Sequence, residues 1–153
     1  MTLPRISVSV KAAILHEDQV LLLSYDDHSG FHYNLPGGKA QEGENLRAAV
    51  HRKVAQETGL TVAVDRLLLV TEYVPASWDN EFGTVQKAQF TFLARPLGDK
   101  TTPRFQDLPD PIQVGFEWTP VDKLTEVYLL PRVGKPLVAA LHGRLRDPFI
   151  DRW

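Results

Sequence analysis

Apolar and polar residues alternate along the start of the chain with the period of a β-strand. Apolar side chains occupy every second position from Ile6 to Ile14, and polar residues such as Lys11 lie between them. This period predicts a strand with one buried face. The polar stretch 16–19 predicts a turn, and residues 20–25 a returning strand, so we expect the chain to open with a hairpin.

Two local signals follow the hairpin. Residues 26–32 are interpreted as a polar loop, and Pro36-Gly37-Gly38 as a tight turn, because glycine adopts backbone angles that are closed to other residues. A helix is then expected over residues 46–58, with Asn45 as its N-cap and Gly59 as the left-handed residue that ends it. Its buried stripe has a four-residue spacing: Leu46, Val50 and Val54.

The rest of the chain predicts further strands and one more long helix. We expect these elements in chain order: strands at 61–74 and 85–95 around a loop at 75–84, an irregular loop at 96–115, a short strand at 116–120, the start of a helix at 121–124, and a helix at 136–145. No repeat or linker interrupts this order. The prediction is therefore one mixed α/β domain over residues 1–153.

Composition narrows the class of protein. The 153 residues are 43% apolar and 24% charged, as in ordinary soluble globular proteins. The net charge of −2 argues against nucleic-acid binding driven by bulk charge, and the lack of cysteine excludes disulfides, thiolate metal sites and cysteine nucleophiles. The apolar runs have the length of strands, far short of a membrane span, and no signal peptide is expected, so we predict a cytoplasmic protein.

The segment from Leu35 to Leu60 carries the chemistry. A Pro-Gly-Gly turn exposes backbone groups that can approach a metal ion or a phosphate closely. Helix positions 53, 56 and 57 share one face, where three carboxylates would form an oxygen cage suited to magnesium or manganese. Glu44, just before the helix, is placed to reach back to Arg52.

This segment resembles the Nudix hydrolase motif, which reads Gly, five residues, Glu, seven residues, Arg-Glu-hydrophobic-x-Glu-Glu-x-Gly-hydrophobic. Leu35-Pro36-Gly37 precede the motif, and seven positions fall on its frame: Gly38, Glu44, Arg52, Val54, Glu57, Gly59 and Leu60. The resemblance implies an α/β/α sandwich with a mixed sheet between helices. It also implies hydrolysis of nucleoside diphosphates linked to another group, with Mg²⁺ or Mn²⁺ as cofactor.

Two positions depart from the motif, because Lys53 and Gln56 stand where the family has acids. The full motif carries four carboxylates and one arginine, whereas here Glu44 and Glu57 face Arg52 and Lys53 with no net charge. Two unit charges 4 Å apart interact by roughly 4 kcal/mol at an effective dielectric constant near 20. We therefore expect Mg²⁺ or Mn²⁺ to bind weakly and to be completed by substrate phosphates.

The resemblance also implies roles for single residues. Glu44, Arg52 and Glu57 are the expected catalytic residues, and a carbonyl at Gly38, Glu57 and Glu44 are the expected metal ligands. Lys53 and Gln56 are predicted to contact the substrate.

Two groups of residues stay open as further candidates. A further acid outside the motif is expected: Asp107, Asp110, Glu117 or Glu72. Trp78 and Phe82 are candidates for stacking a nucleobase, with covering the sheet or packing in a dimer interface as the alternatives.

Three functions follow. The leading one is an attenuated hydrolase of the diphosphate linkage in a nucleoside diphosphate derivative. The resemblance implies a lean to ADP-ribose-like substrates or other nucleotide sugars, because some Nudix enzymes that act on ADP-ribose carry a proline about fifteen residues past the motif, where this chain has Pro75. The alternatives are a catalytically inactive nucleotide-binding or regulatory module, and a catalytic site rebuilt from acids outside the motif. The expected partner is a small nucleotide, without nucleic acid or membrane, and the resemblance makes a homodimer conceivable.

Overall fold

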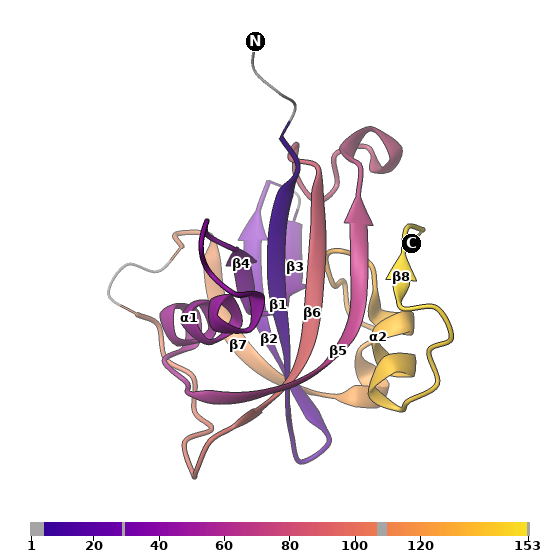
Figure 1. The fold of residues 1–153 in the computed structure, drawn as a ribbon. Helices are drawn as coiled ribbons and strands as arrows, with labels where there is room; N and C mark the ends of the chain where they lie inside the picture. Colours follow the sequence, from indigo (N-terminus) through magenta and orange to yellow (C-terminus); the bar gives the residue numbers. More distant parts are fainter. Residues whose placement is uncertain (1–4, 29, 107–109, 153) are drawn as a thin grey trace.

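The computed structural model describes residues 5–28, 30–106 and 110–152 (Figure 1). Within these residues the chain forms one sheet of eight strands. The strands are β1 (Ser7–His16), β2 (Gln19–Asp27), β3 (Gly30–Asn34), β4 (Gly37–Lys39), β5 (Val62–Tyr73), β6 (Lys87–Pro96), β7 (Gln113–Pro120) and β8 (Phe149–Ile150).

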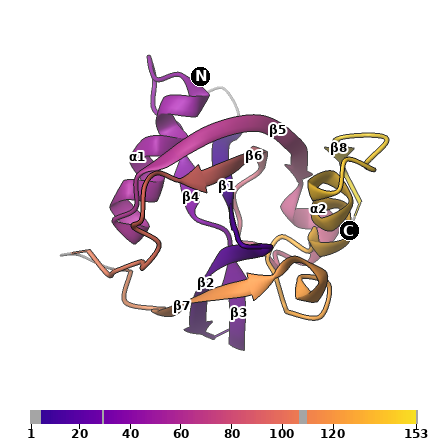
Figure 2. The ribbon, with the colours of Figure 1, turned by 90° about the horizontal axis from the view of Figure 1, so that it is seen from below.

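The sheet is mixed and strongly curved. Its main path runs β3-β2-β1-β6-β5-β8, with β4 paired to β1 and β7 paired to β2. The pairs β1–β6 and β5–β8 are parallel and the other pairs are antiparallel. Figure 2 shows the result: β2, β3 and β7 form one wall, and β1, β6 and β5 curve over as the other.

Two α-helices cover opposite faces of the sheet: α1 (Leu46–Thr58) and α2 (Gly134–Leu141). Ala12 of β1 packs in one apolar cluster with Val54 of α1, whereas the next residue, Ala13, packs in a second cluster with Leu137 of α2. Because consecutive strand residues point to opposite faces, the helices lie on either side of β1, as Figure 1 shows. The predicted mixed sheet between helices is confirmed.

Local sequence signals predicted the hairpin and the first helix correctly. The turn between β1 and β2 is formed by Glu17 and Asp18 with φ of 50° and 60°, as in the two-residue turns that suit the strand twist. Helix α1 has the predicted bounds, and Gly59 ends it with φ 74°. Asn45 holds the N-cap position in an extended conformation, but its side chain makes no capping hydrogen bond.

Two predictions before α1 were wrong. Residues 26–32 are not a loop, because β2 continues to Asp27 and β3 begins at Gly30. The two glycines after Pro36 do not form a tight turn but begin β4, which pairs with β1. A Cβ on Gly37, where φ is 151°, would lie 2.0 Å from the carbonyl oxygen of Val10. Glycine is therefore required there by the close approach of two strands.

The second half of the chain has the predicted order with different bounds. Helix α2 ends at Leu141 instead of residue 145, because Gly143 adopts φ 70° and the Arg144 N–H donates back to the Ala139 carbonyl at 2.8 Å. Strand β7 begins before the predicted strand, at Gln113. The short elements β8 and the 3₁₀ turns η1 (Pro75–Trp78) and η2 (Val121–Lys123) complete the described chain.

Candidate functional site

An arginine–carboxylate pair fixes α1 against the segment that precedes it. Arg52 donates from Nε to Glu44 Oε2 at 2.7 Å and from Nη2 to Glu44 Oε1 at 3.0 Å. The same Nη2 donates to the carbonyl of Lys39, at the end of β4, at 3.0 Å. The hydrogen bond from Arg52, with a second from the Gln41 N–H, lowers the pKa of Glu44 from 4.5 to about 2. Two residues predicted to be catalytic thus lie together and bind each other.

Glu57 is turned toward the start of β4. Its Oε1 accepts a hydrogen bond from the Gly37 N–H at 2.9 Å. Burial raises the pKa of Glu57, and the cations of Lys11 and Lys53 together with the Gly37 N–H oppose that rise. The carboxylate is therefore partly neutralised by the protein itself.

Lys11 is a residue of this site that sequence reasoning missed. The alternation along β1 placed it on an exposed face, yet the side chain is 7% exposed and its Nζ donates to the Leu35 carbonyl at 3.1 Å. Burial lowers the pKa of Lys11 to about 8, although the nearby Glu57 carboxylate acts to raise it. No local signal reveals this burial, because it depends on the segment around Leu35 that covers the strand.

The two departures from the motif make different contacts. Lys53 packs against Gly38: a Cβ on that glycine would lie 2.5 Å from Lys53 Cε and 3.1 Å from its Nζ. Gln56 instead accepts a hydrogen bond from Arg52 Nη1 at 3.3 Å. Lys53 thus presents its charge to β4, and Gln56 belongs to the Arg52 pair.

The candidate acids outside the motif differ in position. Burial is the main cause that raises the pKa of Glu57 and of Tyr25, and the charge of Asp110 raises both further, so this charge acts on the site. Glu117 accepts a hydrogen bond from the Tyr33 hydroxyl, and Glu72 is exposed on β5 opposite Ala88. Asp107, the fourth candidate, lies outside the described residues.

The two candidate aromatic side chains belong to the loop between β5 and β6. Phe82 packs edge-on against Tyr73 with ring centroids 5.6 Å apart, and the Lys87 ammonium lies 4.3 Å from the Phe82 centroid. Trp78 closes the 3₁₀ turn η1. These contacts of Phe82 favour the packing interpretation, and base stacking stays a prediction.

The side chains of this site do not form a complete binding site for a divalent metal ion. Within residues 5–28, 30–106 and 110–152, no three His, Asp or Glu side chains lie close enough to share an ion. Glu44 is engaged by Arg52, and Glu57 faces Lys11 and Lys53. Gly38, Glu57 and Glu44 therefore stay predicted ligands, without the acidic cage that Mg²⁺ prefers.

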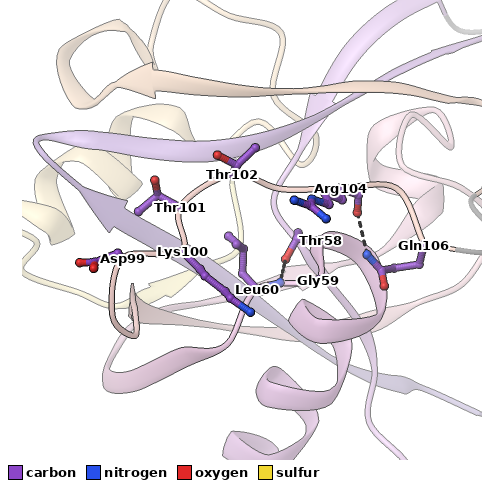
Figure 3. Close-up of a pocket in the computed structure, with 9 residues that line it drawn as sticks. All are labelled: Thr58, Gly59, Leu60, Asp99, Lys100, Thr101, Thr102, Arg104 and Gln106. Atoms are coloured by element: carbon purple, nitrogen blue, oxygen red, sulfur yellow. Dashed lines mark hydrogen bonds between the residues drawn. The ribbon is translucent and has the colours of Figure 1, made fainter.

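A separate cavity of about 410 Å³ lies at the C-terminal end of α1 (Figure 3). Thr58 and Gly59 border it from the helix, and Lys100, Arg104 and Gln106 border it from the segment after β6. The Gln106 side chain donates to the Arg104 carbonyl at 2.8 Å. The predicted catalytic residues Glu44, Arg52 and Glu57 are not among those that line this cavity. The cavity is therefore separate from the candidate site around Glu57.

Comparison with known proteins identifies the family. The family model for the NUDIX domain matches residues 5–141, and the chain therefore belongs to the Nudix family. It is 38% identical over 92 residues to the 8-oxo-dGDP phosphatase NUDT18 of Homo sapiens, a match that covers 58% of this chain and 25% of that protein. It is 37% identical over 59 residues to the NAD-capped RNA hydrolase NudC of Photobacterium profundum, covering 39% of this chain and 22% of that protein.

The chain thus spans a quarter or less of the length of these curated relatives. Among solved structures, a NUDIX hydrolase from Nitrosomonas europaea superposes with a TM-score of 0.70 at 24% identity, over 94% of this chain and 93% of that one. That likeness shows the fold. The family predicted from the motif is confirmed, and with it the hydrolase class at the level of the family, whose members generally need a divalent metal ion such as Mg²⁺. No helix in the described part of the chain is long and apolar enough to cross a membrane.

Proposed function

We propose that the protein binds and hydrolyses the diphosphate linkage of a nucleoside diphosphate derivative at the side chains around Glu57. The observation that carries this proposal is the pair of contacts that hold α1 on β4. Arg52 binds Glu44 through two hydrogen bonds, and Glu57 binds the Gly37 N–H. These contacts fix the motif helix beside the glycine segment, as a site for a phosphate group requires.

The residues divide into positioning and contacting groups. Glu44 and Arg52 hold the helix, and Lys53 meets the diphosphate with its ammonium group because no hydrogen bond or ion pair engages it among the residues described. In the reaction, the oxygen of a water molecule attacks one phosphorus and stays bonded to it, the bond from that phosphorus to the bridging oxygen breaks, and the proton that the attacking water gives up goes to the released phosphate. We propose that Glu57 and Asp110, whose charges act on each other, orient that water.

We propose that the protein without substrate holds no tightly bound metal ion. The donors of the protein do not form a cage, so a Mg²⁺ or Mn²⁺ ion that takes part would arrive with the substrate phosphates. We assign no step to an ion held by the protein within the described residues.

The substrate class follows from chemistry shared by the relatives. The names of NUDT18 and NudC describe substrates that contain a nucleoside diphosphate, 8-oxo-dGDP and NAD-capped RNA. Pro75, the first residue of η1, supports the lean to ADP-ribose-like compounds or other nucleotide sugars. We propose a small nucleotide of this class as the substrate.

A panel assay tests the proposal. The purified protein is incubated with ADP-ribose, NADH, dinucleoside polyphosphates and nucleoside triphosphates in the presence of Mg²⁺ or Mn²⁺, and product release is measured. We expect turnover of at least one nucleoside diphosphate derivative, and a loss of about 100-fold in kcat for Glu57→Gln. His51→Gln, an exposed position on the same helix, is the matched control and should keep full activity.

The second candidate function is a module that binds a nucleotide without cutting it. It is favoured by one observation: the charges of Lys11 and Lys53 act on Glu57, where a hydrolase of this family would hold a metal ion. Binding without turnover across the panel would establish this function in place of the first. A site rebuilt around Asp110 would show the opposite mutational pattern, with Asp110→Asn inactive and Glu57→Gln nearly unaffected.

A further inference from the structure

Four lysines surround the place where β4 pairs with β1. They are Lys11, Lys39, Lys53 and Lys87, here called the lysine cluster, and they are four of the seven lysines in the chain. Lys11 is buried, Lys53 and Lys87 are half-buried and Lys39 is exposed.

The register of the strands brings three of these lysines to one face of the sheet. Lys39 lies opposite Ser9 of β1, and Lys87 of β6 lies opposite Ser7. Because directly opposite residues project to the same side, and β1 residues two apart do so as well, Lys39 and Lys87 share the face of Lys11. Lys53 comes from α1 and packs against Gly38, the chain neighbour of Lys39.

These positive charges act on one another and have few acidic partners. Burial is the main cause that lowers the pKa of Lys11 and of Lys87; the charges of Lys87 and Lys53 lower the pKa of Lys11 further, and the charge of Lys39 lowers that of Lys87 further. None of the four forms an ion pair within 4.0 Å in the described parts of the chain. The acids whose charge reaches this group are Glu57 and, through it, Asp110. The cluster therefore keeps an excess of two positive charges.

The same face of the sheet also carries unused hydrogen-bonding groups. Thr91 lies opposite Lys11, and Thr71 lies opposite Gln89 on the neighbouring strand. Both threonines are only 1% exposed, and neither hydroxyl has a hydrogen-bond partner in the structure. Buried hydroxyl groups are normally paired, so these two are available to water or to a polar ligand.

We infer that the lysine cluster supplies the positive charge that a diphosphate needs at this site, so that the protein binds the diphosphate without a metal ion. This inference rests on the proposed function, since it assigns the diphosphate to the same site. A diphosphate carries about two to three negative charges near neutral pH, which matches the excess charge of the cluster. Lysine binds phosphate as a point charge, so it needs no fixed geometry of ligands.

Glu57 then has a different role from that of a metal ligand. Its Oε1 accepts the Gly37 N–H, and Lys11 and Lys53 offset its charge. A glutamine at this position can accept the same hydrogen bond and adds no negative charge. Metal-free binding of a diphosphate should therefore survive Glu57→Gln, whereas catalysis should not.

Calorimetric titration with inorganic pyrophosphate in the presence of EDTA tests the inference. We expect the natural protein to bind pyrophosphate, with a Kd that changes less than about threefold when Mg²⁺ replaces EDTA. Lys53→Gln and Lys39→Gln should each weaken metal-free binding at least about tenfold, the loss expected for one charge-assisted hydrogen bond. Lys53→Arg should restore most of the affinity, and Glu57→Gln should bind pyrophosphate at least as tightly as the natural protein.

Lys135→Gln is the matched control, because Lys135 is an exposed lysine of α2 whose charge is not among those that shift the pKa of Lys11 or of Glu57. Pyrophosphate binding only in Mg²⁺, or equal effects of Lys53→Gln and Lys135→Gln, would overturn the inference. Turnover of the substrate panel without metal-free binding would leave the proposed hydrolase standing and remove the role of the cluster. Metal-free binding without any turnover would support the role of the lysine cluster and remove the proposed hydrolase.

Discussion

The charged residues on the two sides of α1 are arranged in opposite ways. On one side, Arg52 is fully engaged by Glu44, the Lys39 carbonyl and Gln56. On the other side, Lys53 rests against Gly38 with no ion pair among the described residues, and its neighbour Glu57 bonds to a backbone N–H. The first side keeps Arg52 and Glu44 of the Nudix motif and has Gln56 in place of an acid, and the second side keeps Glu57 and has Lys53 in place of an acid.

This difference separates two tasks of the motif. The Arg52 side attaches the helix to the glycine segment, which is a structural task that needs only a good hydrogen-bonding geometry. The Lys53 side is where a divalent ion would need several carboxylates, and here the local charge has been changed from negative to near neutral. The chain therefore has the framework of the motif, with charges on the Lys53 side of α1 that differ from those of the motif.

The largest effect is expected from Gly37→Ala. A Cβ at this position would meet the Val10 carbonyl oxygen at 2.0 Å, and the φ of 151° is unfavourable for alanine. Because the clash is with backbone, the strands must separate, and we expect a loss of about 3 kcal/mol or more in the free energy of unfolding. Urea denaturation monitored by circular dichroism measures this loss.

Gly38→Ala is the matched control for this prediction. Its added Cβ would meet the end of the Lys53 side chain, at 2.5 Å from Cε, and that side chain can move away. We expect a cost of less than about 1 kcal/mol. Equal destabilisation by the two substitutions would show that the approach of β4 to β1 does not set the requirement for glycine.

A moderate effect is expected from the double variant Lys53→Glu, Gln56→Glu. The two introduced glutamates and Glu57 would then place three negative carboxylates on one face of α1. Their repulsion should lower the melting temperature in EDTA. Mg²⁺ should raise it again, by several degrees at about 100 times the Kd, because an ion that binds only the folded state stabilises it. The natural protein should show no such shift.

Thermal denaturation with and without Mg²⁺ measures this difference directly. Gln56→Glu alone is the control, since it keeps Lys53 and should respond to Mg²⁺ much less than the double variant. If Mg²⁺ stabilised the natural protein and the double variant equally, the charges at positions 53 and 56 would not decide whether this helix binds Mg²⁺, and the prediction would be wrong.

The same contrast shows which features could be predicted from sequence. The bounds of α1 follow from signals inside the segment, the apolar spacing of Val50 and Val54 and the glycine at position 59, so they could be predicted to the residue. The Arg52–Glu44 pair was predicted as well, because Glu44 lies just before the helix, from where it can reach back to Arg52.

The features that could not be predicted depend on parts of the chain distant in sequence. Gly37 and Gly38 form a strand only because β1 lies beside them, and a local pattern of glycines cannot reveal that pairing. Lys11 belongs to the site for the same reason: its alternation in β1 indicated an exposed face, whereas the packing of the chain covers both faces there. The grouping of lysines likewise depends on the register between β1, β4 and β6.

The smallest effect concerns pH, and it distinguishes the two carboxylates of the motif. The pKa of Glu44 is lowered from 4.5 to about 2 by Arg52, so its stabilising contribution is complete above pH 4.5 and is lost as the pH falls toward 2. Burial raises the pKa of Glu57, so its charged form costs stability above that raised pKa, and the cost disappears as the pH falls through it. Glu44→Gln should therefore flatten the fall in melting temperature between about pH 6 and about pH 3, and Glu57→Gln should steepen it. If the melting temperatures of the two variants changed with pH in the same way over this range, the two carboxylates would not be held in different electrostatic environments. The two sides of α1 would then differ in geometry alone.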